Sequence, residues 1–151
     1  MILKKLNSRL FMAIATLFII SVVAIPAFAG SVSFSYKMRT GFVSGTYNNV
    51  YHTLPANKTV TCKASGTCVE EKWNPLPKAQ NVTYSLYRKG FLGIETFFGS
   101  VTGDTNGNVN KSFSKKTDKQ SDKYFLIISK PEINSSRDDG RVIHGKGELI
   151  Y

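Results

Sequence analysis

The two cysteines, Cys62 and Cys68, are the residues of this chain whose type and spacing most directly suggest chemistry. Five residues separate them in CKASGTC, and the Ser65-Gly66 pair between them predicts a tight turn. Two short strands joined by such a turn would bring the sulfur atoms together, and an oxidising compartment would then favour a disulfide. A zinc site is the alternative, but it needs about four ligands and the motif supplies two. We therefore expect a Cys62–Cys68 disulfide, worth about 2.4 kcal/mol by loop-closure arithmetic.

Catalytic signatures are scarce. His52 and His144 are the two histidines of the chain, and neither Gly-x-Ser-x-Gly nor His-Glu-x-x-His occurs. Glu70 and Glu71 are adjacent, and neighbours on a strand point to opposite faces, so they cannot form one acid–base site. The sequence favours a protein that is not an enzyme, with no cofactor and no metal.

The segment DTNGN alternates oxygen-bearing side chains and so raises the question of calcium. An EF-hand loop that began at Asp104 would need Gly and Glu at its sixth and twelfth positions, where this chain has Val109 and Lys115. The pair Asn106-Gly107 instead predicts the tip of a tight β-hairpin, because both residue types tolerate positive φ angles.

Lysines crowd the segment KSFSKKTDKQSDK, where they are moderated by two aspartates. A solvated loop that protects a sheet edge is the simpler interpretation. The functional interpretation is a contact zone for a phosphate-rich polymer or another anionic surface. The residues concerned are Lys111, Lys115, Lys116, Lys119 and Lys123.

The turn in RKGFLGIETFFG is apolar where a turn is expected to be polar. In one interpretation, Phe91 and Leu92 fold back and plug an open end of the core. In the other, they form an exposed tip for a membrane or protein partner, with Arg88 and Lys89 at the lipid headgroups. The sequence favours the plug, because scattered surface hydrophobes are common and one turn is too small to bind a bilayer strongly.

These residues need a scaffold, and the chain predicts one in residues 30–151. Residues 1–29 have the layout of a secretory signal peptide: a basic start, an apolar run and an Ala-x-Ala end before Gly30. This segment holds three of the 20 basic residues, which leaves 17 Lys and Arg against 10 Asp and Glu, a net charge of +7. The remaining chain is long enough for one domain with a core.

Short stretches of alternating apolar and polar residues recur along residues 30–151, separated by turn residues. Alternation is clear in the segments from Val32 and from Val82, and KYFLIISK is apolar enough to lie centrally in a sheet. The segment RVIHGKGELIY is expected to be the closing strand. We expect an all-β, single-domain antiparallel β-sandwich of eight to ten strands with little or no helix.

Export and basic charge together predict a partner class. We expect a secreted bacterial protein, extracellular or associated with the cell wall, that binds anionic wall polymer, lipid headgroups or a protein partner without catalysis. Export argues against nucleic acid, and the processed chain is not expected to be an integral membrane protein. The alternatives are a secreted antimicrobial or membrane-active protein and, third, a hydrolase or protease inhibitor.

Overall fold

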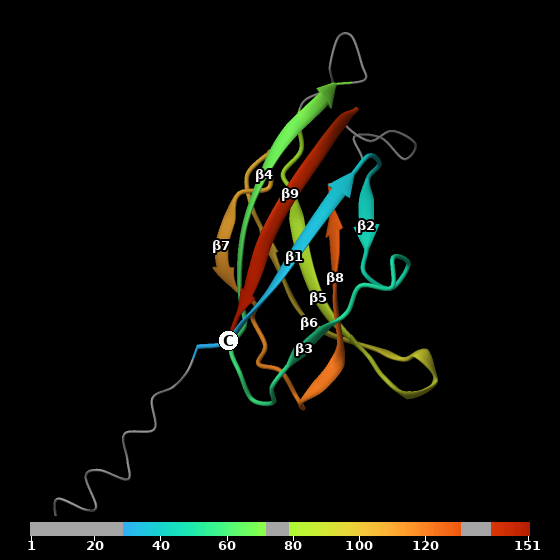
Figure 1. The fold of residues 1–151 in the computed structure, drawn as a ribbon, viewed down its shortest axis with the longest axis vertical. Helices are drawn as coiled ribbons and strands as arrows, with labels where there is room; N and C mark the ends of the chain where they lie inside the picture. Colours follow the sequence, from blue (N-terminus) through green and yellow to red (C-terminus); the bar gives the residue numbers. More distant parts are fainter. Residues whose placement is uncertain (1–28, 72–78, 131–139) are drawn as a thin grey trace, which may run out of the picture.

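The computed structural model describes residues 29–71, 79–130 and 140–151. The predicted signal peptide up to residue 28 and the expected connections at 74–78 and 131–139 lie outside the described residues. Within the described part, no helix is long and apolar enough to cross a membrane. The described residues form nine strands and one 3₁₀ turn (Figure 1): β1 (Ser31–Met38), β2 (Phe42–Ser44), β3 (His52–Leu54), β4 (Thr61–Glu71), β5 (Thr83–Lys89), η1 (Phe91–Gly93), β6 (Glu95–Thr102), β7 (Val109–Ser112), β8 (Ser121–Ser129) and β9 (Arg141–Ile150).

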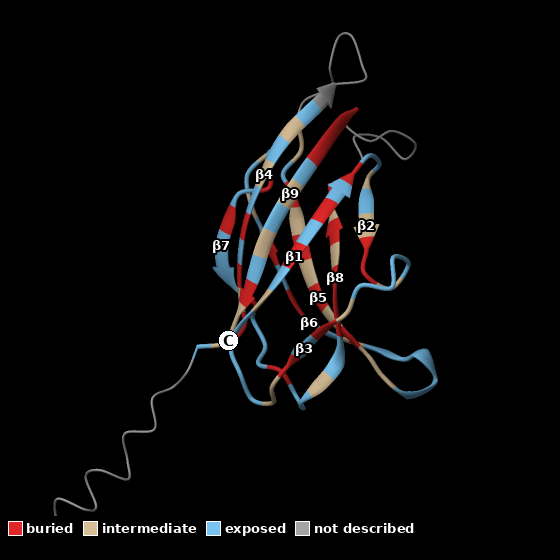
Figure 2. Cartoon of the chain, in the orientation of Figure 1, coloured by how far each residue is buried: buried red, intermediate tan, exposed pale blue. Residues whose placement is uncertain are grey.

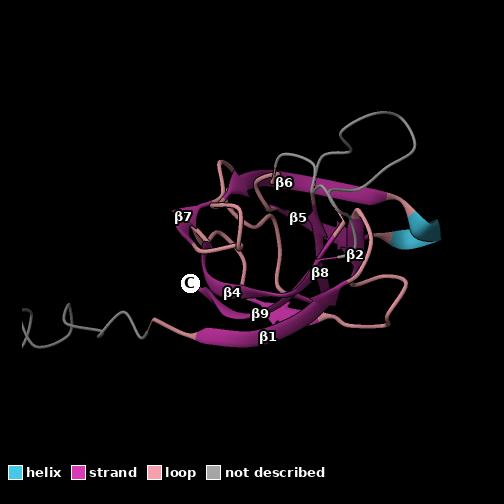
Figure 3. Cartoon of the chain, turned by 90° about the horizontal axis from the view of Figure 1, so that it is seen from above, coloured by secondary structure: helices cyan, strands magenta, loops and turns pink. Residues whose placement is uncertain are grey.

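The strands form two antiparallel sheets, so the predicted all-β sandwich is confirmed. The first sheet has the order β1-β9-β4-β7, and the second has the order β2-β8-β5-β6 with β3 also paired to β8. Figure 3 shows the two layers, with β1, β9 and β4 on one side of the molecule and β5, β6 and β8 toward the other. The apolar strand β8 lies inside its sheet as predicted, because it pairs with β2, β3 and β5.

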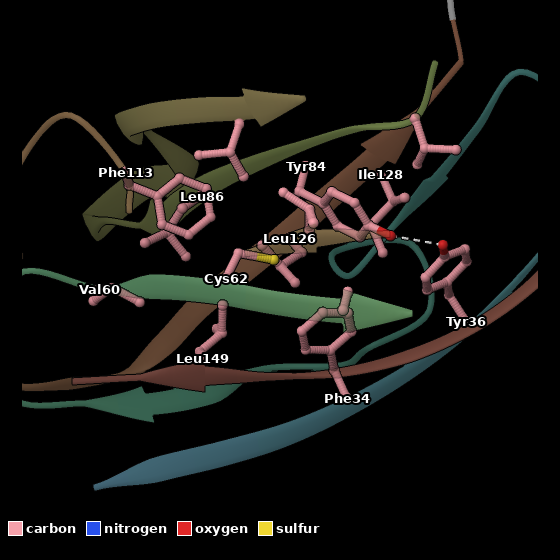
Figure 4. Close-up of a cluster of buried hydrophobic side chains, with 14 of the residues drawn as sticks. Phe34, Tyr36, Val60, Cys62, Tyr84, Leu86, Phe113, Leu126, Ile128 and Leu149 are labelled. Atoms are coloured by element: carbon pink, nitrogen blue, oxygen red, sulfur yellow. Dashed lines mark hydrogen bonds between the residues drawn. The ribbon is translucent and has the colours of Figure 1, made fainter. Parts of the chain in front are cut away.

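Alternate side chains of the strands point between the sheets and make one core (Figures 2 and 4). Two tyrosines join the layers there: the Tyr36 hydroxyl of β1 lies 2.7 Å from the Tyr84 hydroxyl of β5. Tyr84 donates its own proton to the carbonyl of Gly107 at 2.7 Å, so Tyr36 must be the donor between the two rings. Burial is the main reason that the pKa values of both phenols are raised.

Strand β4 corrects one prediction, because it runs unbroken through the expected Ser65-Gly66 turn. Gly66 stands in the middle of this strand where the Asn106 carbonyl of another loop crosses it, and a Cβ atom would collide with that oxygen. Gly145 of the neighbouring strand β9 has a similar role, since the Tyr36 ring occupies the space of its missing side chain. These glycines permit close packing and do not mark turns.

The predicted hairpin at Asn106-Gly107 is also wrong in its connectivity. The segment is a turn, with Gly107 at φ 92°, but β6 belongs to the second sheet and β7 to the first. Asp104 holds the turn through its Oδ1, which accepts hydrogen bonds from the backbone N–H groups of Asn106 and Asn108 at 2.8 and 2.9 Å. The turn therefore links the two layers.

Candidate functional site

The β5–β6 hairpin ends in a short turn that projects beyond the body of the sandwich (Figures 1 and 3). The backbone N–H of Gly90 donates to the Ile94 carbonyl at 2.6 Å, and the N–H of Ile94 donates to the Phe91 carbonyl at 3.3 Å. Lys89 and Glu95 are cross-strand partners just below this turn. The turn is thus hydrogen bonded across its base and has a defined shape.

The apolar side chains of this turn point into solvent, so the prediction that they plug the core is wrong. Phe91 is 86% exposed, Leu92 is 83% exposed and Ile94 is 69% exposed. Figure 2 shows the whole hairpin end in the colour of exposed residues. We call Phe91, Leu92 and Ile94 the apolar tip. The alternative interpretation, an exposed tip, describes its geometry.

Leu92 takes an unfavourable backbone conformation within the apolar tip. Its φ and ψ angles are 58° and 21°, in the left-handed region that costs an ordinary L-residue about 1–2 kcal/mol. Gly93 follows with φ 80°, and a Cβ atom there would meet open space. Gly or Asn at position 92 would have less backbone strain, because both adopt this conformation more easily. Leucine at this position is a local cost with no packing gain in the described structure.

Arg88 closes the end of the sandwich that Phe91 and Leu92 were expected to plug. Its side chain is 8% exposed, because Arg88 follows Tyr84 and Leu86 on the inward face of β5. The guanidinium makes two hydrogen bonds to the Asp118 carboxylate, at 2.9 Å from Nε and 2.6 Å from Nη2. The guanidinium holds the pKa of Asp118 below its usual value. Arg88 is therefore committed to this ion pair, and its predicted contact with lipid headgroups is wrong.

The Arg88–Asp118 pair joins two features that the sequence presented separately. Asp118 lies in the lysine-rich loop, and Arg88 is the second-last residue of β5, two positions before the tip turn begins at Gly90. Tyr124 adds to the junction, since its hydroxyl donates at 2.7 Å to the Lys119 carbonyl. The lysine-rich loop is consequently fastened to the base of the apolar tip. Lys89, beside this junction, is half-buried.

The five predicted lysines do not form one uniform patch. Lys111 lies on β7 and donates to the Thr102 carbonyl at 2.9 Å, away from the loop. Lys116 and Lys119 are exposed on the loop itself. The Lys115 ammonium lies 5.8 Å from the centre of the Phe97 ring, and Lys123 lies 5.7 Å from that of Tyr51. The structure therefore brings Lys115, Lys116 and Lys119 near the hairpin base and separates Lys111 from them.

A row of aromatic rings crosses the second sheet and supports the hairpin. Tyr87 of β5 stacks on Phe125 of β8 with ring centres 5.6 Å apart, and it contacts Phe97 of β6 at 5.1 Å. Tyr51 packs edge-on against Phe125 at 6.1 Å. Lys115 and Lys123 stand over the two terminal rings, Phe97 and Tyr51, as cation–π partners. The row gives the hairpin a firm base, and sequence reasoning missed it because its members come from four separate segments.

The predicted disulfide is wrong, because Cys62 and Cys68 lie on the same strand and are not joined. Six residues of extended strand place their Cα atoms roughly 20 Å apart, whereas a disulfide needs less than about 7 Å. Cys62 is buried in the core beside Leu86, Leu126 and Leu149 (Figure 4). Burial raises the pKa of its thiol to about 12, so this sulfur is an inert core atom.

The two histidines belong to different sheets. His52 of β3 is buried, its ring packs edge-on against Phe34 at 6.3 Å, and burial lowers its pKa. His144 of β9 is exposed, with Lys37 and Thr67 as its cross-strand neighbours. Across residues 29–71, 79–130 and 140–151, no three His, Cys, Asp or Glu side chains are grouped so that they could hold a metal ion.

Comparison with known proteins does not indicate a function for this chain. No family model matches the chain, and no curated protein matches it. Among solved structures, a chain of Desmodium yellow mottle tymovirus is similar at 12% sequence identity and a TM-score of 0.20, with 83% of this chain and 89% of that chain covered. So low a TM-score carries no argument about fold or function.

Proposed function

We propose that this protein is an exported, non-enzymatic bacterial domain that docks on an anionic lipid membrane through the apolar tip. The observation that carries the proposal is the exposure of three large apolar side chains on one hydrogen-bonded turn. Such exposure on a protein surface usually marks a contact site. The strained conformation of Leu92 supports this interpretation, because no packing contact in the described fold offsets the strain.

The size of the tip sets the expected strength of binding. Full transfer of one such side chain out of water contributes about 1.5–3 kcal/mol, so three side chains that are largely exposed offer roughly 4–7 kcal/mol. Each lysine held near an anionic membrane adds about 1 kcal/mol. Lys115, Lys116 and Lys119 lie on the loop fastened to the hairpin base and are the candidates for this contribution. The tip inserts, and the loop favours anionic lipid over neutral lipid.

Lipid explains the tip better than wall polymer does. A phosphate-rich wall polymer would be bound by the lysines alone and would gain nothing from phenylalanine, leucine and isoleucine in solvent. A protein partner with an apolar groove remains the competing occupant, and it becomes the conclusion if vesicles fail to bind.

Leu92→Asn is the variant that tests the proposal. Asparagine tolerates the left-handed conformation at position 92, so the variant should unfold at the same denaturant concentration as the wild type or at a higher one. Its co-sedimentation with phosphatidylglycerol vesicles should fall about tenfold or more, because each tenfold corresponds to about 1.4 kcal/mol. Val69→Thr is the matched control: Val69 is 52% exposed on the other sheet, and its replacement should leave binding unchanged.

Salt separates the two contributions. Binding to phosphatidylglycerol should weaken between about 0.01 and 0.1 M salt, as the Debye length falls from about 30 to 10 Å. The triple change of Lys115, Lys116 and Lys119 to Glu should remove most of that salt dependence. Failure of the wild type to bind vesicles at low salt would refute membrane docking, and so would binding by Leu92→Asn equal to that of the wild type.

A further inference from the structure

A second group of exposed apolar side chains lies on β2 and on the loop that joins β2 to β3. Phe42 is 51% exposed, Tyr47 is 81% exposed and Val50 is 44% exposed. The Phe42 and Tyr47 rings contact each other with their centres 6.2 Å apart. The β2–β3 loop and the β5–β6 hairpin project from the same side of the sandwich in two perpendicular views (Figures 1 and 3). One flat surface can therefore touch both.

The β2–β3 loop has a fixed shape. The N–H of Val50 donates to the Gly45 carbonyl at 2.8 Å, and the N–H of Gly45 donates to the Leu126 carbonyl of β8 at 2.8 Å. Gly45 fits closely against β8, since a Cβ atom there would lie 2.9 Å from that of Phe125. Because Phe125 is also the buried ring of the aromatic row, both protruding loops rest on the same support. Tyr47 is held out from this support before any ligand arrives.

A cationic hollow of about 350 Å³ opens beside Tyr47. Two basic side chains line it, Lys37 at the end of β1 and Arg39 in the following turn. Thr40, Ser44 and Asn48 add hydroxyl and amide groups to the lining, and Phe42 and Val43 add apolar surface. Arg and Lys are the residues that bind phosphate groups, and hydroxyl and amide donors suit the remaining phosphate oxygens. An exposed tyrosine beside them is typical of the membrane interface, where the ring meets lipid and its hydroxyl meets water.

We infer that the β2–β3 loop is a second membrane contact and that the hollow at Lys37 and Arg39 receives the phosphate headgroup of an anionic lipid. The inference rests on the proposed docking of the apolar tip and adds a lipid class to it. Phe42 and Tyr47 enter the interface while the apolar tip inserts, and the hollow holds the headgroup of a lipid next to Tyr47. Two contacts on one rigid scaffold explain how loops this small hold the domain on a membrane, since stable anchoring generally takes two signals.

Tyr47→Ser tests the second contact. The side chain is so exposed that the unfolding midpoint should not change, whereas co-sedimentation with phosphatidylglycerol vesicles should fall at least fivefold. In the double variant Tyr47→Ser/Leu92→Asn, vesicle binding should fall by the product of the two single fold-reductions, because both loops contact one bilayer independently. Val69→Thr again serves as the control that keeps wild-type binding.

Lys37→Gln together with Arg39→Gln tests the hollow. These changes should reduce binding to phosphatidylglycerol vesicles at least fivefold and leave the weaker binding to phosphatidylcholine vesicles unchanged. Soluble glycerol 1-phosphate at millimolar concentration should not displace the protein from vesicles. Displacement would show a site for free phosphate esters and would overturn the assignment to membrane lipid.

The outcomes separate this inference from the proposed function. If the wild type fails to bind vesicles, the proposed function and this inference fall together. If Leu92→Asn loses binding while Tyr47→Ser binds like the wild type, membrane docking stands and the second contact is refuted. If the wild type cross-links vesicles into aggregates, the two loops contact different bilayers, which also overturns docking on a single plane.

Discussion

The two residues of the Arg88–Asp118 ion pair differ in burial, so their single replacements should lower the free energy of unfolding by different amounts. The Arg88 side chain is 8% exposed, whereas that of Asp118 is 43% exposed. Asp118→Ala leaves a buried guanidinium without its counter-ion, and breaking a fully buried pair in this manner costs about 3–5 kcal/mol. Water reaches the Asp118 side, so we expect a loss of about 2–3 kcal/mol here.

Arg88→Met should be milder, because it removes the buried charge together with its need for a partner. The Asp118 carboxylate keeps water and the Lys119 N–H, which donates to it at 2.9 Å. We expect a loss of about 1 kcal/mol, and the double variant Arg88→Met/Asp118→Ala should be more stable than Asp118→Ala alone. Urea unfolding followed by circular dichroism measures all four proteins.

The same pair predicts an acid dependence. The pKa of Asp118 is lowered in the folded protein, so the unfolded chain takes up the proton first as pH falls. The stabilisation is therefore present above the ordinary carboxyl pKa of about 3.9 and is lost at lower pH. The gap between the wild type and Asp118→Ala should narrow below about pH 4. An equal gap at pH 3 and pH 7, or a double variant no more stable than Asp118→Ala, would refute the ion-pair account.

Two further predictions concern the core. Gly66→Ala should lower the free energy of unfolding by about 1–3 kcal/mol in urea titrations, because the new methyl collides with the Asn106 carbonyl. Ser65→Ala is the neighbouring control. Equal unfolding midpoints for the two variants would contradict the close approach of the Asn106 carbonyl to Gly66. Raised pKa values of Tyr36 and Tyr84 predict that stability falls as pH rises above about 10, since the unfolded tyrosines release protons that the folded ones retain. Tyr84→Phe should show a shallower fall between pH 9 and 11, and an identical slope would count against the buried hydroxyl pair.

Much of the sheet architecture could be predicted because strand patterns are local. Alternating side chains mark β1 and β5, and a continuous apolar run marks the central strand β8. Each pattern needs only neighbours in sequence to be recognised, since successive side chains of a strand face opposite ways. The two-layer fold then follows from apolar faces that must be covered.

The errors arise where a residue is chosen for a contact distant in sequence. Gly66 resembles a turn residue, but it is there because the Asn106 carbonyl crosses β4 forty residues later. The predicted Cys62–Cys68 disulfide failed for the same reason, because it needed that turn. Nothing within six residues of Gly66 distinguishes a turn from a close approach of another backbone.

The direction of the apolar tip had the same dependence on distant residues. Whether Phe91 and Leu92 cover the core or point away depends on what already fills that end of the sandwich. Arg88 fills it, and an arginine can do so only because Asp118, thirty residues later, supplies the charge. The sequence showed an unusual turn and a cationic loop, but their junction appears only in three dimensions.

The choice of residues in the apolar tip is hard to explain by folding alone. Phe91, Leu92 and Ile94 leave most of their apolar surface in water, and Leu92 adds backbone strain that asparagine or glycine would avoid. The hairpin beneath needs neither feature, because its register is set by the pairing of β5 with β6 and β8 and its base is held by Arg88. A residue that exposes apolar surface and strains the backbone lowers the free energy of the system only when that surface is transferred out of water. A lipid bilayer provides such an environment without a matching cavity, and the lysines on the adjoining loop favour a bilayer that carries negative charge.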